Sequence, residues 1–153
     1  MRPRDWAPAD MGAAAAEWLS GALLPGGRDA WRVDRPAAAF TGILFDAVQI
    51  PRGAVRGQDR GEVESCFQQA DVDGAVIADP FHTIYYALVA PGASQGWDLY
   101  EFPCFGPSHS IPMPPPHRAD PPGVHWVLSP PDGPETLCEV EWVLELIAQM
   151  SAS

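Results

Sequence analysis

Lysine is absent from this sequence: its nine basic residues are all arginine and face twenty acidic ones, for a net charge of −11 at pH 7. The arginines are also unevenly placed, because residues 1–60 hold eight of them and the remainder holds only Arg118. Affinity for nucleic acid comes largely from cations that neutralise phosphates. We therefore do not expect binding to bulk DNA.

Long apolar runs are missing as well. No stretch approaches the roughly 20 apolar residues that a membrane span requires. The first residues, MRPRDWAPAD, contain an aspartate and prolines, where a secretory signal peptide would have an apolar segment of about 7 to 15 residues. We therefore expect no membrane association and a cytoplasmic location.

Cysteine is scarce, with Cys66, Cys104 and Cys138 far apart in the chain. An odd number at this spacing argues against a disulfide framework and against a CxxC metal site. The length of 153 residues is that of one domain, so residues 1–153 are expected to form a single unit.

Apolar periodicity predicts three helices. The first covers residues 9–24 and is capped by Asp10, and the second covers residues 59–71 with a capping box formed by Asp59 and Glu62. The third covers residues 134–150 at the carboxyl end. All three have an apolar stripe that would pack on other elements.

Apolar runs rich in β-branched and aromatic residues predict strands at 41–51, 74–80 and 83–92, the last two as a hairpin. Nine prolines lie between Pro112 and Pro134, so strands in that region should be short or at a sheet edge. The order of elements predicts an α+β domain with a mostly antiparallel central sheet, containing residues 43–50 and 83–90, and helices packed against it.

Two short motifs contain residues that could be catalytic or bind a metal ion. GASQG, residues 92–96, matches the nucleophile elbow with Ser94 as nucleophile, but no helix is predicted after it, so a glycine-rich turn is preferred. Asp71 and Asp73 form a D-x-D pair that precedes a strand and is followed by glycine, which is typical of a turn.

Histidines at 109, 117 and 125, together with Cys104, have side chains that could hold zinc or copper. Their spacing matches no known ligand signature, and His125 falls inside a predicted strand. We therefore expect no metal and no cofactor.

The succession GILFDAVQIP, GAVIADPFHTIYYALVAPG, CFGPSHSIPMPPP, GVHWVLSPP and LELIAQM covers most of the chain. It resembles short actinobacterial proteins grouped with the bifunctional DNA primase/polymerase N-terminal domain, a branch of the archaeo-eukaryotic primase superfamily. The resemblance implies a primase/polymerase-like fold.

The resemblance also implies that the catalytic site is degenerate. Active members have two metal-binding aspartates on one strand, and alignment on Phe45 and Asp46 places Gln49 and Pro51 at those positions. The histidine that contacts the nucleotide would be His82, although counting back from Pro91 falls nearer Tyr85. No acid lies in CFGPSHSIPMP, where a third metal ligand is expected.

Loss of the metal ligands predicts a pseudoenzyme that binds a protein partner or a small ligand. Arg52, Arg56 and Arg60, which follow the strand in one loop, are the expected ligand-binding cations, together with Tyr85 and His109. The plainer alternative is that these arginines only offset neighbouring acids.

Two enzymatic alternatives remain open. One is a small enzyme of unfamiliar type that uses His82 or His109. The other is a residually active primase/polymerase, in which Asp46, Asp71, Asp73 and His82 would be the first residues to test.

Overall fold

The computed structural model describes residues 8–55 and 60–152. The helices are α1 (Pro8–Leu19), α2 (Gly27–Arg32), α3 (Arg60–Gln69) and α4 (Val140–Ala152), with short 3-10 turns at Ser20–Ala22, Arg52–Ala54 and Pro134–Thr136. The strands are β1 (Ala37–Phe40), β2 (Asp46–Pro51), β3 (Val76–Asp79), β4 (Ile84–Val89), β5 (Cys104–Phe105), β6 (Ser110–Met113) and β7 (His125–Trp126).

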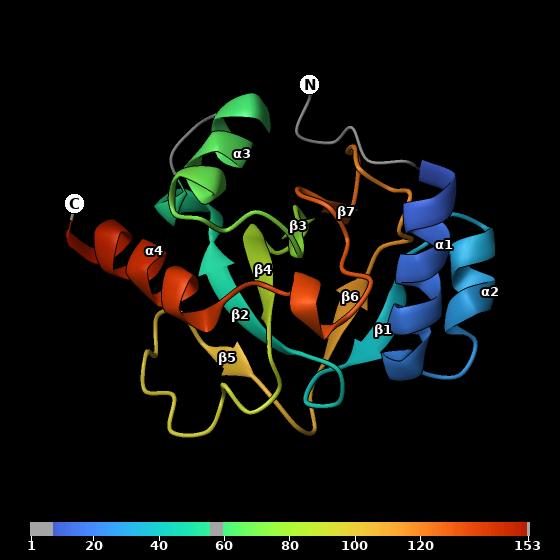
Figure 1. The fold of residues 1–153 in the computed structure, drawn as a ribbon, viewed down its shortest axis with the longest axis horizontal. Helices are drawn as coiled ribbons and strands as arrows, with labels where there is room; N and C mark the ends of the chain where they lie inside the picture. Colours follow the sequence, from blue (N-terminus) through green and yellow to red (C-terminus); the bar gives the residue numbers. More distant parts are fainter. Residues whose placement is uncertain (1–7, 56–59, 153) are drawn as a thin grey trace.

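The main sheet has five strands in the order β5-β2-β4-β3-β7, and every neighbouring pair in it is antiparallel. β3 and β4 form the predicted hairpin. A second sheet pairs β1 with β6. Figure 1 shows α1 and α2 beside β1 at one end of the molecule and α3 and α4 at the other. The predicted α+β architecture with a mostly antiparallel central sheet is confirmed.

Register assigns side chains to the two faces of the main sheet, because residues directly opposed in an antiparallel pair share a face. Ile50, Tyr85, Ala78 and His125 are aligned across the sheet, and we call their side the Tyr85 face. Gln49, Tyr86, Ile77 and Trp126 are aligned on the other side, the Tyr86 face.

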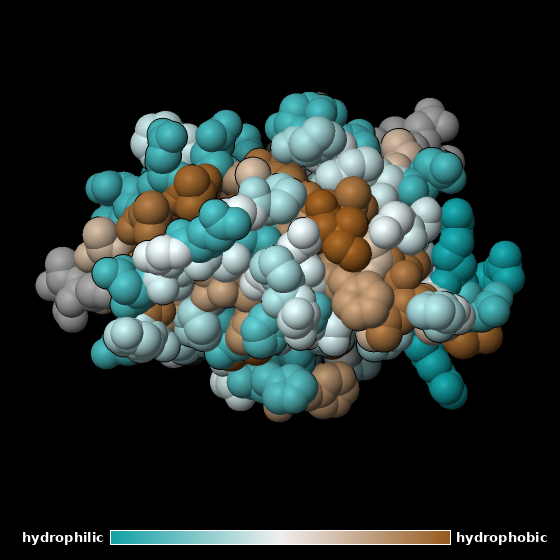
Figure 2. Space-filling model, turned by 90° about the horizontal axis from the view of Figure 1, so that it is seen from below, coloured by the Kyte–Doolittle hydropathy of each residue, from teal (hydrophilic) through white to brown (hydrophobic). Residues whose placement is uncertain are grey.

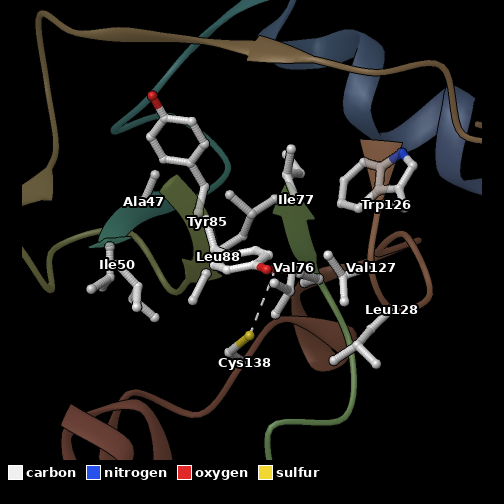
Figure 3. Packing of buried hydrophobic residues seen from close by; sticks show 14 of the residues in the cluster. Ala47, Ile50, Val76, Ile77, Tyr85, Leu88, Trp126, Val127, Leu128 and Cys138 are labelled. Carbon is white, nitrogen blue, oxygen red and sulfur yellow. Dashed lines mark hydrogen bonds between the residues drawn. The ribbon is translucent and has the colours of Figure 1, made fainter. Parts of the chain in front are cut away.

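Helix α3 packs on the Tyr85 face. The rings of Phe67 and Tyr85 meet edge to face at 76°, with centroids 5.5 Å apart. Figure 3 shows Tyr85 within the apolar cluster of the sheet. The tyrosine thus contributes its ring to the core.

The segment before α4 pairs with the end of β4. Cys138 forms a parallel bridge with Val89, and its backbone N–H donates to the carbonyl of Leu88 at 2.8 Å. Its Sγ lies 2.9 Å from the carbonyl oxygen of Gly74 and 3.7 Å from that of Ala75, and Figure 3 shows Cys138 beneath the buried side chains of the sheet. Burial raises the pKa of this thiol to about 12.

Two predicted boundaries are wrong. The first helix is already helical at Pro8, so Asp10 lies inside it rather than at its cap, and it ends at Leu19. The strand expected from residue 41 or 43 begins only at Asp46, because Gly42 has φ +86° and donates its N–H to the carbonyl of Phe45 at 2.7 Å. A turn therefore occupies residues 41–45.

The other expected elements are present in the structure. The second helix is α3, although Asp59 of the predicted capping box lies outside the described residues. The third helix is α4, which begins at Val140 and not at residue 134, where a short 3-10 turn lies instead. The proline-rich region holds only β6, in the small sheet, and β7, at the edge of the main sheet. Within the described part of the chain, none of the helices combines the length and the apolar character needed to cross a membrane.

Candidate functional site

A cleft of about 220 Å³ opens on the Tyr85 face, between α3 and the segment that leads into β7. Its lining comprises Arg52, Val63, Ala78, Asp79, Pro80, Ile84, Tyr85, Pro121, His125 and Val127. Most of these side chains are apolar, so a ligand bound there would be held by an apolar wall with a few polar groups, as is usual for small-molecule sites.

Arg52 and Tyr85 supply the polar groups on one side of the cleft. Arg52 directly follows β2, and its backbone N–H donates to the carbonyl of Thr83 at 2.9 Å, which holds it next to the start of β4. Its guanidinium lies close enough to Tyr85 for its positive charge to lower the pKa of the phenol. The sequence predicted both residues as ligand-binding, and the structure brings them together.

Burial raises the pKa of Tyr85 above its ordinary value of 10.0, and the positive charge of Arg52 partly opposes that shift. The phenol therefore remains protonated at neutral pH, and its hydroxyl can both donate and accept hydrogen bonds.

His125 and Pro121 form the other side of the cleft. Nδ1 of His125 lies 2.8 Å from the carbonyl oxygen of Gly123. A carbonyl oxygen can only accept, so Nδ1 carries a proton. From the sequence, His125 is either a metal-ligand candidate or a hydrogen-bonded or exposed strand residue, and the register to Ala78 that brings it to the cleft cannot be derived from local pattern.

Asp79 and His82 form a pair at the turn between β3 and β4. Nδ1 of His82 lies 2.8 Å from Oδ2 of Asp79, and Oδ1 accepts the backbone N–H groups of Phe81 and His82. The carboxylate is buried, whereas the imidazole is 71% exposed. Sequence analysis singled out His82 but missed Asp79, although an aspartate just before a turn is a common cap of that turn.

Gln49 and Pro51 lie on the Tyr86 face, opposite Tyr86 and Ile84. Neither side chain carries a carboxylate, the group that binds divalent metal ions most readily in sites of this kind. No group of three or more histidine, cysteine or acidic residues able to hold a metal ion occurs in the described ranges.

Asp46 is fully buried at the start of β2. Its Oδ2 accepts the backbone N–H groups of Gly92 and Ser94, at 3.0 and 2.8 Å. Residues 91–96 form turns, and no helix follows, so the strand-to-helix geometry of a nucleophile elbow is not present at Ser94. Together with burial, the charge of Asp46 also raises the pKa of Cys104, to about 12.

The remaining predicted histidines lie apart from the cleft lining. His109 is exposed, and its ring centroid lies 5.1 Å from that of Phe105. Nε2 of His117 lies 3.1 Å from a carboxylate oxygen of Asp34. His109 therefore does not line the cleft with Arg52 and Tyr85, although the sequence analysis names all three as ligand-binding residues.

Asp71 and Asp73, which the sequence predicts to lie in a turn, follow the end of α3. Asp71 has φ +63° and its backbone N–H donates to the carbonyl of Gln68 at 3.0 Å, which agrees with a turn. Of the other predicted cations, Arg56 lies outside the described residues, and Arg60 begins α3 but its side chain is not among the described ones.

Exposed apolar side chains provide a second kind of surface. Phe40 and Ile43 are 41% and 54% exposed, and Tyr100 is 92% exposed. Figure 2 shows hydrophobic side chains on the face seen from below, gathered mainly toward the end that carries α1 and α2. Such patches are typical of protein contacts.

Comparison of the chain with protein-family models gave no match, and neither did comparison with curated proteins or with solved structures.

Proposed function

We propose that this protein is a non-catalytic, primase/polymerase-like domain that acts as a binding module for a small ligand or a protein partner. The resemblance of its strand sequences, together with the α+β architecture, is the support for the fold relationship. The observation that carries the binding role is the cleft on the Tyr85 face, where Arg52 and Tyr85 meet beside an apolar wall.

A lack of nucleotidyl transfer follows from the proposed positions of the metal ligands. In that reaction, metal ions neutralise charge on the phosphates, and Gln49 and Pro51 have no carboxylate to hold them. Asp46, the nearest acid on the same strand, binds the turn at Gly92 and Ser94 instead.

The test is incorporation of labelled nucleotide by the purified protein with Mg²⁺ or Mn²⁺. No incorporation is expected. Metal-dependent incorporation that is lost in Asp46→Asn or His82→Ala, with folding retained, would refute the proposal and restore the residually active primase/polymerase.

Weak binding to bulk DNA is part of the same proposal, because residues 61–153 hold thirteen acids and one arginine. Anisotropy of labelled single- and double-stranded DNA at roughly 150 mM salt, where screening weakens loose attraction, should show no sub-micromolar binding. Tight binding that disappears in Arg52→Ala would indicate a role in replication instead.

A protein partner would use a different surface. Tyr100, Phe40 and Ile43 are exposed, and aromatic side chains are enriched at protein interfaces. The proposed location remains the cytoplasm.

A second candidate is a small enzyme that uses His82, and the pair formed with the buried Asp79 favours it. A carboxylate that holds Nδ1 orients the imidazole and leaves Nε2 toward solvent, as in a general base. The plainer role of Asp79 is to hold the turn through two backbone N–H groups. Catalysis of any reaction that is lost in His82→Gln, while the melting temperature is unchanged, would favour the enzyme.

A further inference from the structure

The cleft on the Tyr85 face combines apolar walls with one arginine. Val63 of α3 and Val127, which follows β7, belong to the lining, as do Ala78 and Pro121. A flat apolar group bound between them would be removed from water on both sides, which is favourable in proportion to the apolar area buried.

Arg52 differs from most of the described arginines in its partners. Three others form ion pairs with carboxylates: Arg28 with Glu17, Arg32 with Asp29 and Arg118 with Asp34. Within residues 8–55 and 60–152, no carboxylate pairs with Arg52, which lines the cleft beside Tyr85. Among these described residues its guanidinium charge is therefore uncompensated, and its fork of donors matches a carboxylate or a phosphate.

Asp79, the one acid in the lining, is placed so that it does not repel an anion bound beside Arg52. Register places Asp79 opposite Ile84, on the face of the sheet that carries Tyr86. Its carboxylate is bound by the turn and by His82. Burial raises the pKa of Tyr86 and the charge of Asp79 adds to that shift, whereas at Tyr85 the charge of Arg52 opposes the rise in pKa that burial causes.

The volume limits the size of the ligand. An engineered apolar cavity of roughly 150 Å³ is known to hold benzene, so a cleft of about 220 Å³ has room for one six-membered ring and a small substituent. A nucleotide, with base, sugar and phosphate, would extend out of a cleft of that size into solvent. Inorganic phosphate alone would leave the apolar walls uncovered.

We propose that this cleft binds a monocyclic aromatic acid, with the ring between Val63 and Val127 and the carboxylate on Arg52 and Tyr85. The guanidinium donates to the carboxylate, and the Tyr85 hydroxyl donates a further hydrogen bond. This inference rests on the proposed binding function and names the ligand class for its small-ligand form.

Calorimetric titration of the full chain with benzoate tests the inference, with benzamide, inorganic phosphate and adenosine monophosphate as comparison ligands. Benzoate should bind, and benzamide, which has the same shape without the charge, should bind about tenfold more weakly or worse. Arg52→Gln should weaken benzoate binding by a similar factor, and Tyr85→Phe by a smaller one.

Arg32→Gln is the matched control, because it removes the same charge from an exposed pair on α2 and should leave benzoate binding unchanged. Melting temperatures of all variants establish that they fold. Absence of heat with benzoate, equal affinity in Arg52→Gln, or phosphate or adenosine monophosphate binding as tightly as benzoate would overturn the inference.

These results are separable from the test of the proposed function. If benzoate does not bind, only the proposed ligand class is refuted. If the protein incorporates nucleotides in a metal-dependent way, only the claim that the domain is non-catalytic is refuted.

Discussion

Oδ2 of Asp46 lies 2.8 Å from the backbone nitrogen of Ser94, 48 residues further along the chain. The same oxygen accepts the N–H of Gly92, so one buried carboxylate joins the first residue of β2 to the turn after β4. Asp46 therefore has a structural role in holding this turn.

Replacing this carboxylate should destabilise the fold. Asp46→Ala leaves the partly buried N–H groups of Gly92 and Ser94 without their acceptor and is expected to lower the free energy of unfolding by about 2 kcal/mol. Asp46→Asn keeps one acceptor oxygen and should cost less. Urea unfolding measures both, with the exposed Asp98→Ala as a control expected to change stability by less than about 0.5 kcal/mol. Wild-type stability in both Asp46 variants would contradict the role assigned to the carboxylate.

Gly42 and Gly26 provide a matched pair, with φ of +86° and +85°. A Cβ at Gly42 would lie 2.5 Å from the backbone nitrogen of Pro107, whereas one at Gly26 meets nothing within 4 Å. Both alanine variants incur the left-handed backbone penalty of about 1 to 2 kcal/mol. Gly42→Ala should lose at least about 1 kcal/mol more, because only there does backbone have to move. Equal losses in urea unfolding would show that the turn at Gly42 adapts freely.

Two phenylalanines should differ sharply in their contribution to stability. Phe67 is fully buried against Tyr85, and Phe81 is 76% exposed. Phe67→Ala is expected to cost about 3 to 5 kcal/mol through lost burial and a cavity. Phe81→Ala should change stability by less than about 0.5 kcal/mol. Thermal or urea unfolding of the two variants decides the matter, and a large loss at Phe81 would indicate packing that its exposure does not show.

Stability should fall at alkaline pH. Burial raises the pKa of Cys138 from 9.0 to about 12, so the folded state prefers the neutral thiol. That preference is fully present below pH 9 and is lost as pH rises toward 12. The raised pKa values of Tyr85 and Tyr86 act in the same direction above pH 10.

The free energy of unfolding, measured by urea between pH 7 and pH 11, should therefore decline above pH 9. Cys138→Ala should decline less steeply than the wild type. Parallel curves for the two proteins would mean that this thiol does not contribute to the alkaline loss.

Sequence pattern predicted the elements that have strong local signals. The β-branched and aromatic run at Ile84–Val89 forms β4, and the apolar stripe of the last helix forms α4. It missed β1, because Ala37–Phe40 is alanine-rich and is a strand only through its pairing with β6. It also missed α2, whose six residues, Gly27–Arg32, are too few to show a period.

The site was predictable to a similar extent. Arg52 could be proposed from residue type and position, and Tyr85 only through the family resemblance. That the two residues lie side by side could not be predicted, because their proximity depends on the register in which Ile50 opposes Tyr85. The contribution of His125 depends on β7 being placed at the far edge of the same sheet, which no local pattern specifies.

The pairing of β1 with β6 also concerns the nascent chain. Ala37 opposes Met113, and Trp31 donates its indole N–H to the Met113 carbonyl, 82 residues further on. At roughly 5 to 20 residues per second, the ribosome needs about 4 to 15 s between making Ala37 and making Met113. During that interval the amino-terminal segment has no partner strand, so chaperones that recognise exposed apolar chain can reach it before the fold closes.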